Sequence, residues 1–269
     1  MAEIEVQDVS LGYGRRLVLE SLNFRVTGGE MVGLIGPNGG GKSTVIRALS
    51  RVIPTRSGKI LVDGRDVTRI PRHELARLIG VVPQIPLLPS AFTAFEIVLM
   101  GRNPHLGLLQ RESPADLDSA WQAMGMTSTR NLARRRVSEL SGGEIQCLLI
   151  ARVLVQATRV VLLDEPTANL DISRQVEILG LIKRLCLTEK LAVLAAIHDL
   201  NLASQYCDRL VLLRQGRIYA EGTPGEVITT DNLRAVYGVQ NGVYIRMVDE
   251  RPIVLPRAGD IKTAGSSDS

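Results

Sequence analysis

Residues 36–44 read Gly-Pro-Asn-Gly-Gly-Gly-Lys-Ser-Thr, and this run is the strongest indication of the fold class in the chain. It follows the apolar run Met31–Ile35, which has the length of a buried strand, and it precedes residues 45–49, whose pattern predicts a helix. Glycines between a strand and a helix let the backbone wrap around a phosphate, with its N–H groups pointing inward. The helix adds the positive end of its dipole at the same point. The sequence therefore predicts a nucleotide-binding protein of the α/β class.

The whole loop is expected to contact the nucleotide phosphates. Lys42 would reach the β- and γ-phosphates, and Ser43 would hold Mg²⁺. The loop by itself fits kinases, GTPases and ATPases equally well. Its predicted phosphate-binding residues are Gly36, Pro37, Asn38, Gly39, Gly40, Gly41, Lys42, Ser43 and Thr44.

Two further motifs narrow the choice. Residues 140–144, Leu-Ser-Gly-Gly-Glu, precede a predicted helix, so their N–H groups could also cap a phosphate. The apolar run 160–163 ends in Asp164 and Glu165, the arrangement that a Mg²⁺ site and a general base need. We expect Asp164 to orient the metal and its water, and Glu165 to lie beside the attacking water. Surface acids often end a strand, but rarely in combination with two phosphate-binding motifs.

The rest of the chain changes its pattern twice. Residues 1–65 read as short strands with turns, residues 86–140 have helical periodicity, and strands alternate with helices from residue 141 onward. This alternation predicts a mostly parallel sheet with helices on both faces. Residues 210–221 predict a hairpin. The Gly-, Ser- and Asp-rich residues 258–269 predict a disordered tail.

Composition argues against several classes of protein. The 269 residues include 32 Lys and Arg against 28 Asp and Glu, a surplus too small and too dispersed to favour a nucleic-acid partner. Three cysteines without metal-ligand spacing indicate buried free thiols. We find no signal-peptide pattern, and no stretch approaches the roughly 20 apolar residues of a membrane span. The chain is therefore expected to be cytosolic, or attached to a membrane through a partner.

Together the motifs resemble the ATP-binding cassette (ABC) family over almost the whole chain. The loop 36–44, the Leu-Ser-Gly-Gly-Glu run, the Asp164-Glu165 pair and His198 stand in the family's order and spacing. The resemblance implies an ATPase that acts on ATP with Mg²⁺. It assigns Glu165, His198 and Gln84 to catalysis, and Ser43, Gln84 and Asp164 to the metal. It also assigns Tyr13 to stacking on the adenine base. Asp171, in the Asn169-Leu170-Asp171 loop, is assigned to the nucleotide site.

The resemblance also implies an architecture. It predicts a P-loop NTPase core with a mostly parallel sheet, an N-terminal antiparallel β subdomain, and a helical subdomain at about residues 86–157. The ABC ATPase domain would span residues 1–232. A short C-terminal extension, residues 233–257, would follow it before the tail.

Members of this family work as head-to-tail dimers. Ser141, Gly142 and Gly143 would therefore act on the ATP that the other subunit's phosphate loop holds. Because the chain has one copy of each motif, we expect a homodimer. One departure is the run Ile145-Gln146-Cys147, where the family usually continues with glutamine and arginine; the missing arginine would remove a salt bridge near the signature helix.

Three weaker stretches resemble the importer branch that serves iron–siderophore complexes, haem and cobalamin: residues 98–105, 198–203, and 236–239 with the segment up to Pro256. This implies a polytopic permease as partner, a substrate-binding protein that acts only through the permease, and a peripheral position at the cytoplasmic face of the cell membrane. Alternatives are an exporter, or a non-transport cassette such as a cluster-assembly ATPase, which share the catalytic motifs. The resemblance also implies that residues 87–92 and 101–109 form a groove for a short cytoplasmic helix of the permease. The apolar residues there without an obvious core are Leu87, Leu88, Phe92, Leu106, Leu108 and Leu109.

Overall fold

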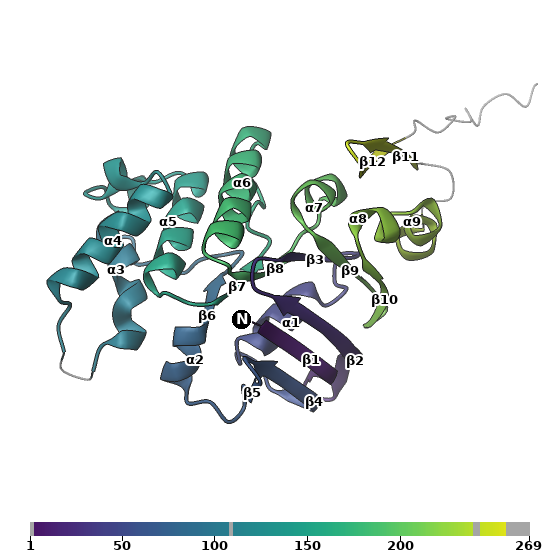
Figure 1. Cartoon of the computed structure of the whole chain (residues 1–269), viewed down its shortest axis with the longest axis horizontal. Helices are drawn as coiled ribbons and strands as arrows, with labels where there is room; N and C mark the ends of the chain where they lie inside the picture. The colour runs from purple at the N-terminus through teal and green to yellow at the C-terminus, as the bar shows by residue number, and fades with distance from the viewer. Residues whose placement is uncertain (1–2, 108–109, 239–242, 257–269) are drawn as a thin grey trace, which may run out of the picture.

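The computed structural model describes residues 3–107, 110–238 and 243–256. Its N-terminal part is an antiparallel sheet of strands in the order β2-β1-β4-β5 (Figure 1). These strands are β1 (Glu3–Tyr13), β2 (Arg16–Thr27), β4 (Thr55–Val62) and β5 (Arg65–Asp66). Apolar side chains such as Ile4, Val6 and Leu22 point into the core from one face, as alternation along a strand requires.

A second sheet forms the centre of the molecule, with the strand order β10-β9-β3-β8-β7-β6. Its members are β3 (Met31–Ile35), β6 (Ile79–Val82), β7 (Val160–Asp164), β8 (Ala192–Ala196), β9 (Arg209–Arg214) and β10 (Arg217–Gly222). All neighbours are parallel except β9 and β10, which form the predicted hairpin. Every residue of β3, β7 and β8 is buried, because both faces of the sheet are covered. The prediction of an α/β fold with a mostly parallel sheet is confirmed.

Helix α1 (Lys42–Leu49) lies between the two sheets, and α6 (Ile172–Thr188) covers the opposite face of the central sheet (Figure 1). Val45 and Ile46 of α1 belong to one apolar core, whereas Ile178 and Leu179 of α6 belong to another. The remaining helices around the sheet are α2 (Arg72–Leu78), α7 (Leu200–Tyr206), α8 (Pro224–Val227) and α9 (Thr230–Tyr237).

A third apolar core lies inside a group of helices at one side of the molecule (Figure 1). This group consists of α3 (Ala94–Leu99), η1 (Met100–His105), α4 (Pro114–Met126), η2 (Arg130–Leu132), η3 (Val137–Glu139) and α5 (Gly142–Val155). Ile97, Met124 and Leu148 are fully buried there. The rings of Phe95 and Trp121 pack at 4.7 Å between centroids and join α3 to α4. The helices therefore have a core of their own, within the range expected for the helical subdomain.

The C-terminal region contains a feature that the sequence did not predict. Strands β11 (Val243–Val248) and β12 (Arg251–Pro256) form an antiparallel hairpin. Helix α9 crosses the expected border between residues 232 and 233. The tail predicted at residues 258–269 lies outside the described residues. Within the described ranges, none of the helices has the length and apolar character needed to cross a membrane.

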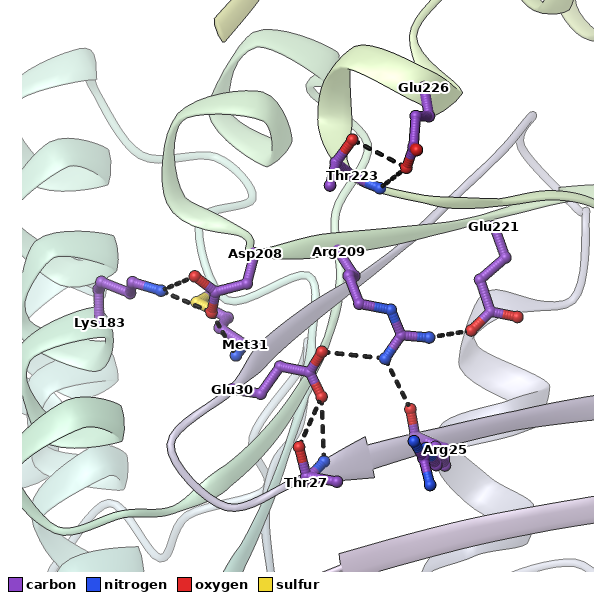
Figure 2. Close-up of polar contacts among 10 residues, drawn as sticks. All are labelled: Arg25, Thr27, Glu30, Met31, Lys183, Asp208, Arg209, Glu221, Thr223 and Glu226. Atoms are coloured by element: carbon purple, nitrogen blue, oxygen red, sulfur yellow. Dashed lines mark hydrogen bonds and ion pairs between the residues drawn. The ribbon is translucent and has the colours of Figure 1, made fainter. Parts of the chain in front are cut away.

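Polar contacts fix the end of the central sheet that lies opposite the phosphate loop (Figure 2). Arg209, at the start of β9, donates to Glu30 at 2.9 Å and forms an ion pair with Glu221 of β10. Asp208 pairs with Lys183 of α6 and accepts the first backbone N–H of β3 at 2.8 Å. These contacts join β3, β9, β10 and α6, and so fix the direction in which β3 enters the sheet.

Candidate functional site

The loop between β3 and α1 adopts a conformation that requires glycine at two positions. Gly36 has φ 144°, and a Cβ there would lie 2.5 Å from the carbonyl oxygen of Leu213. Gly41 has φ 97°, and a Cβ there would lie 2.8 Å from the Leu19 side chain. Both positions favour glycine because their φ angles are positive and because a side chain would have no room there. The strand, the tight loop and the helix start therefore have the local geometry that the predicted phosphate-binding unit requires.

This loop surrounds a cavity of about 160 Å³. The cavity is lined by Val18, Asn38, Gly39, Gly40, Gly41, Lys42, Ser43, Thr44 and Glu165. The structure thus gathers residues 38–44 around one space, as predicted, while Pro37 lines a neighbouring hollow. Val18 was missed, because an apolar residue in a strand carries no sequence signal for a ligand; only the position of β2 beside the loop reveals it.

Lys42 is buried inside the loop, at 4% exposure. Its Nζ donates to the carbonyl oxygens of Gly36 and Pro37, at 2.9 and 3.1 Å. Burial lowers the pKa of Lys42, and the nearby carboxylates of Glu165 and Asp164 only partly offset this. A buried cation gains most from an anion that enters the cavity. The arrangement therefore favours binding of phosphate.

Two carboxylates face this cation from the carboxyl end of β7. Asp164 is 7% exposed, and its Oδ1 accepts a hydrogen bond from Ser43 Oγ at 2.8 Å. Glu165 has φ 48°, in the left-handed region, and its N–H bonds to the carbonyl oxygen of Ala196 at 3.1 Å. A non-glycine residue in this conformation is strained, and such strain is concentrated at functional sites. The turn places the Glu165 side chain at the cavity wall.

Glu165 also meets residues that follow two other strands. Its Oε2 accepts a hydrogen bond from Gln84 Nε2 at 2.7 Å and lies 4.0 Å from His198 Nδ1, which is too long for a hydrogen bond. Gln84 follows β6 and His198 follows β8, so parallel strands bring the three side chains to one edge of the sheet. Gln84, Glu165 and His198, which come from three separate segments of the chain, therefore lie in one cluster.

A divalent cation fits the same edge by the chemistry of its donors. The Ser43 hydroxyl and the Asp164 carboxylate lie in contact and offer hard oxygen ligands of the kind that Mg²⁺ prefers. Gln84 bonds to Glu165 through its amide nitrogen, which leaves its carbonyl oxygen for such a role. The residues present are therefore compatible with the expected metal.

The remaining predicted residues do not line this cavity. Ser141 caps α5, and its hydroxyl donates to Glu144 Oε2 at 2.8 Å. Gly142 lies close to Leu170, since a Cβ added at Gly142 would be 3.6 Å from the Leu170 side chain. Asp171 caps α6 by accepting the N–H of Arg174 at 2.9 Å. The signature residues, including the buried Gly143, thus lie beside the start of α6. They are separate from the phosphate cavity of their own chain.

Tyr13 ends β1, opposite Arg16 in the hairpin, with 44% of its surface exposed. It does not line the phosphate cavity. An exposed ring face is what stacking on a base requires. Its role as adenine platform stays a prediction.

Comparison with known proteins shows the same architecture elsewhere. A family model described as ABC transporter matches residues 19–168. The ferric enterobactin transport ATP-binding protein FepC of Escherichia coli (strain K12) is 38% identical over 256 residues, covering 95% of this chain and 93% of that protein. An ABC transporter described as of the metal-chelate type, solved in an inward-facing conformation, superposes with a TM-score of 0.83 at 27% identity, covering 96% of this chain and 99% of its own. The dimeric structure of the bacterial ABC transporter cassette MJ0796 superposes with a TM-score of 0.72 at 26% identity, covering 82% and 98%.

Proposed function

This chain belongs to the ABC transporter family as an ATP-hydrolysing cassette, and we propose that it powers uptake of a metal chelate such as an iron–siderophore complex, haem or cobalamin. The observation that carries the catalytic part is the position of Glu165. It lines the cavity that holds Lys42 and bonds to Gln84. A base beside a cationic phosphate cradle is what hydrolysis of a phosphoanhydride needs.

We infer the following roles. The loop N–H groups and Lys42 hold the β- and γ-phosphates and orient the γ-phosphorus. Glu165 accepts a proton from water as the water oxygen bonds to that phosphorus and the bond to the bridging oxygen of ADP breaks. Gln84 and His198 hold the water and the transferred phosphoryl group in line. Ser43, Asp164 and Gln84 would hold Mg²⁺, which neutralises charge on the phosphate oxygens when it is bound.

A second copy of the chain is the partner that completes the site in this proposal. Ser141 and Gly142 are exposed and separate from the cavity that Lys42 lines. Beside them, Ile172 is 79% exposed and Val176 is 47% exposed on one face of α6. Exposed apolar side chains beside a phosphate-binding motif that does not serve the cavity of its own chain favour a protein interface. The dimeric MJ0796 cassette supports a dimer of this kind.

The shared site can be tested by mixing two inactive chains. Lys42→Ala removes the phosphate cradle, and Ser141→Arg blocks the signature. A heterodimer of the two has one intact composite site and one that is broken twice, so ATPase activity should return. As a second measurement, a photoreactive ATP held by a Lys42-containing chain should crosslink to the signature of the other chain. Crosslinks only within one chain would contradict the dimer proposal.

The surface proposed for the permease needs one correction. Leu88 is half-buried and packs against two of the apolar cores, so it is not free to bind a partner. Leu87 is 97% exposed, Ile85 is 78% exposed and Phe92 is 38% exposed. Leu106 is half-buried, and Leu108 and Leu109 lie outside the described residues. We therefore place the docking surface at Ile85, Leu87 and Phe92, which follow directly after Gln84.

This surface and the importer assignment can be tested together. Ile85→Glu with Leu87→Glu should leave ATP binding intact but abolish co-purification with the permease and uptake of radiolabelled ferric siderophore. Val52→Glu is the matched control, since Val52 is 71% exposed on another part of the chain. Normal assembly and uptake in the double variant would show that Ile85 and Leu87 do not form the docking surface. Export of substrate by reconstituted vesicles, or the absence of any permease partner, would instead favour an exporter or a non-transport cassette.

Substrate class and location follow from the same proposal. The likeness to a ferric enterobactin transport protein and to a metal-chelate type transporter supports a chelate as cargo. The cargo would bind a separate capture protein and the permease, and not this chain. Attachment through the permease would place the chain at the cytoplasmic face of the membrane.

A further inference from the structure

Helix α7 carries the residues that follow His198, and it is too short to be stable on its own. It is seven residues long, and isolated helices shorter than about 12 residues are marginal in water. Asp199 caps its start, where its Oδ1 accepts the N–H groups of Asn201 and Leu202 at 2.8 and 2.9 Å. The chain after His198 is therefore fixed only as well as α7 itself is fixed.

Apolar packing of Ala203 holds α7 against the central sheet, and the hairpin β11–β12 adds to that fixation through two side chains. The Asn201 amide pairs with the backbone of Val254 in both directions, donating to its oxygen at 3.1 Å and accepting its N–H at 2.7 Å. Arg251 donates from Nη1 to the carbonyl oxygens of Ser204 and Cys207, at 2.8 and 2.7 Å. Carbonyl oxygens at the end of a helix lack partners within it, and a cation there also meets the negative end of the dipole.

His198 thus lies between two anchors. Before it, the N–H of Ile197 bonds to Leu34 of β3 at 3.0 Å, which ties the chain to the central sheet. After it, Asp199 and Asn201 connect the chain to the hairpin. The His198 side chain is 47% exposed and 4.0 Å from Glu165, so neighbouring side chains do little to hold it in place.

We propose that Arg251 and Asn201 are positioning residues for ATP hydrolysis: they lock α7 onto the C-terminal hairpin and so keep His198 beside Glu165. The inference rests on the proposed role of His198 at the γ-phosphate. The hairpin does not line the phosphate cavity, and Lys42 lies on a different helix. Loss of the clamp should therefore slow catalysis and leave ATP binding unchanged.

The test compares Arg251→Ala and Asn201→Ala with Arg246→Ala in the full-length chain. Arg246 lies on the other strand of the same hairpin and is exposed, which makes it a matched control. In the two clamp variants we expect kcat for ATP to fall about tenfold, since small misplacements of a catalytic group are costly, with KM unchanged. Amide hydrogen exchange should become faster across residues 200–206. Arg251→Lys, which keeps a charged donor, should recover part of kcat.

His198→Ala serves as the reference. If it hydrolyses ATP at the wild-type rate, the proposed role of His198 fails and the clamp has nothing to position. If His198→Ala is impaired while Arg251→Ala and Asn201→Ala keep a normal kcat, only the clamp is refuted. A parallel change of kcat, KM and Tm in the clamp variants would show a general structural role and would also overturn the inference.

Discussion

Gly101 lies in η1, where η1 meets the end of α5, and replacing it with alanine should weaken that joint. A Cβ at Gly101 would lie 2.3 Å from the carbonyl oxygen of Arg152 and 3.3 Å from the nitrogen of Gln156. Both atoms belong to the backbone around the end of α5. Nearby, Arg102 donates to the Val155 oxygen at 3.1 Å, and His105 Nε2 lies 2.8 Å from the Gln156 oxygen. Relief of the clash must therefore move η1 away from α5 and stretch these bonds.

The shift needed is about 1 Å, and overpacking of this kind costs about 1–3 kcal/mol. We take about 2 kcal/mol for Gly101→Ala, which lowers a urea midpoint by roughly 0.7 M if the m value is near 3 kcal/mol/M. Trp121 is the only tryptophan of the chain and stacks on Phe95 inside the helical group. Its fluorescence in a urea titration therefore reports on this part of the molecule. Circular dichroism, recorded on the same samples, reports on the whole chain.

The control is Gly225→Ala, because a Cβ there meets nothing within 4 Å. It should change the free energy of unfolding, obtained from the fluorescence midpoint, by less than about 0.5 kcal/mol. If Gly101→Ala unfolds at the same urea concentration as the wild type, η1 is not in tight contact with α5. Residues 100–105 would then not form a tight joint with α5.

Three further predictions concern single sites. Lys42→Ala should weaken ATP binding about tenfold to hundredfold, because a charge-assisted hydrogen bond is lost. Isothermal titration calorimetry would measure this loss, and an unchanged affinity would show that Lys42 does not bind the phosphates. Arg209→Ala should lower the free energy of unfolding by about 1–2 kcal/mol, since it breaks the network of Figure 2 at a partly exposed position, and a urea midpoint equal to the wild type would refute this. Burial raises the pKa of Cys147 and Cys186 to about 11 and that of Cys207 to about 12, so iodoacetamide at pH 8 should leave the native chain unmodified and label all three thiols only in urea.

The phosphate loop and the acidic pair could be predicted because their chemistry is local. Gly36 and Gly41 are needed for backbone conformation, and Lys42 stands at a fixed distance from them along the chain. Asp164 and Glu165 end an apolar strand whose parallel neighbours carry the other polar groups to the same edge. For such residues, position in the sequence already determines position in the fold.

Other features depend on contacts between distant segments. Val18 lines the cavity only because β2 runs beside the loop. The sequence offers Leu88 no obvious core, yet its side chain packs against two apolar cores. The hairpin β11–β12 contains Pro252 and Pro256, which weaken a strand pattern, and its packing on α7 through Asn201 and Arg251 has no local signal. These contacts become visible only when the chain is folded.

The replacement Glu165→Gln is the sharpest test of whether Glu165 acts as the general base. The amide keeps the size and the hydrogen-bonding reach of the carboxylate but cannot accept the proton from water, whereas the phosphate contacts of Lys42 remain. With ATP and Mg²⁺, the variant should bind nucleotide as the wild type does, elute as a dimer in size-exclusion chromatography, and hydrolyse ATP at least about a hundredfold more slowly. Hydrolysis near the wild-type rate would show that Glu165 is not the base, and would contradict the catalytic site described above.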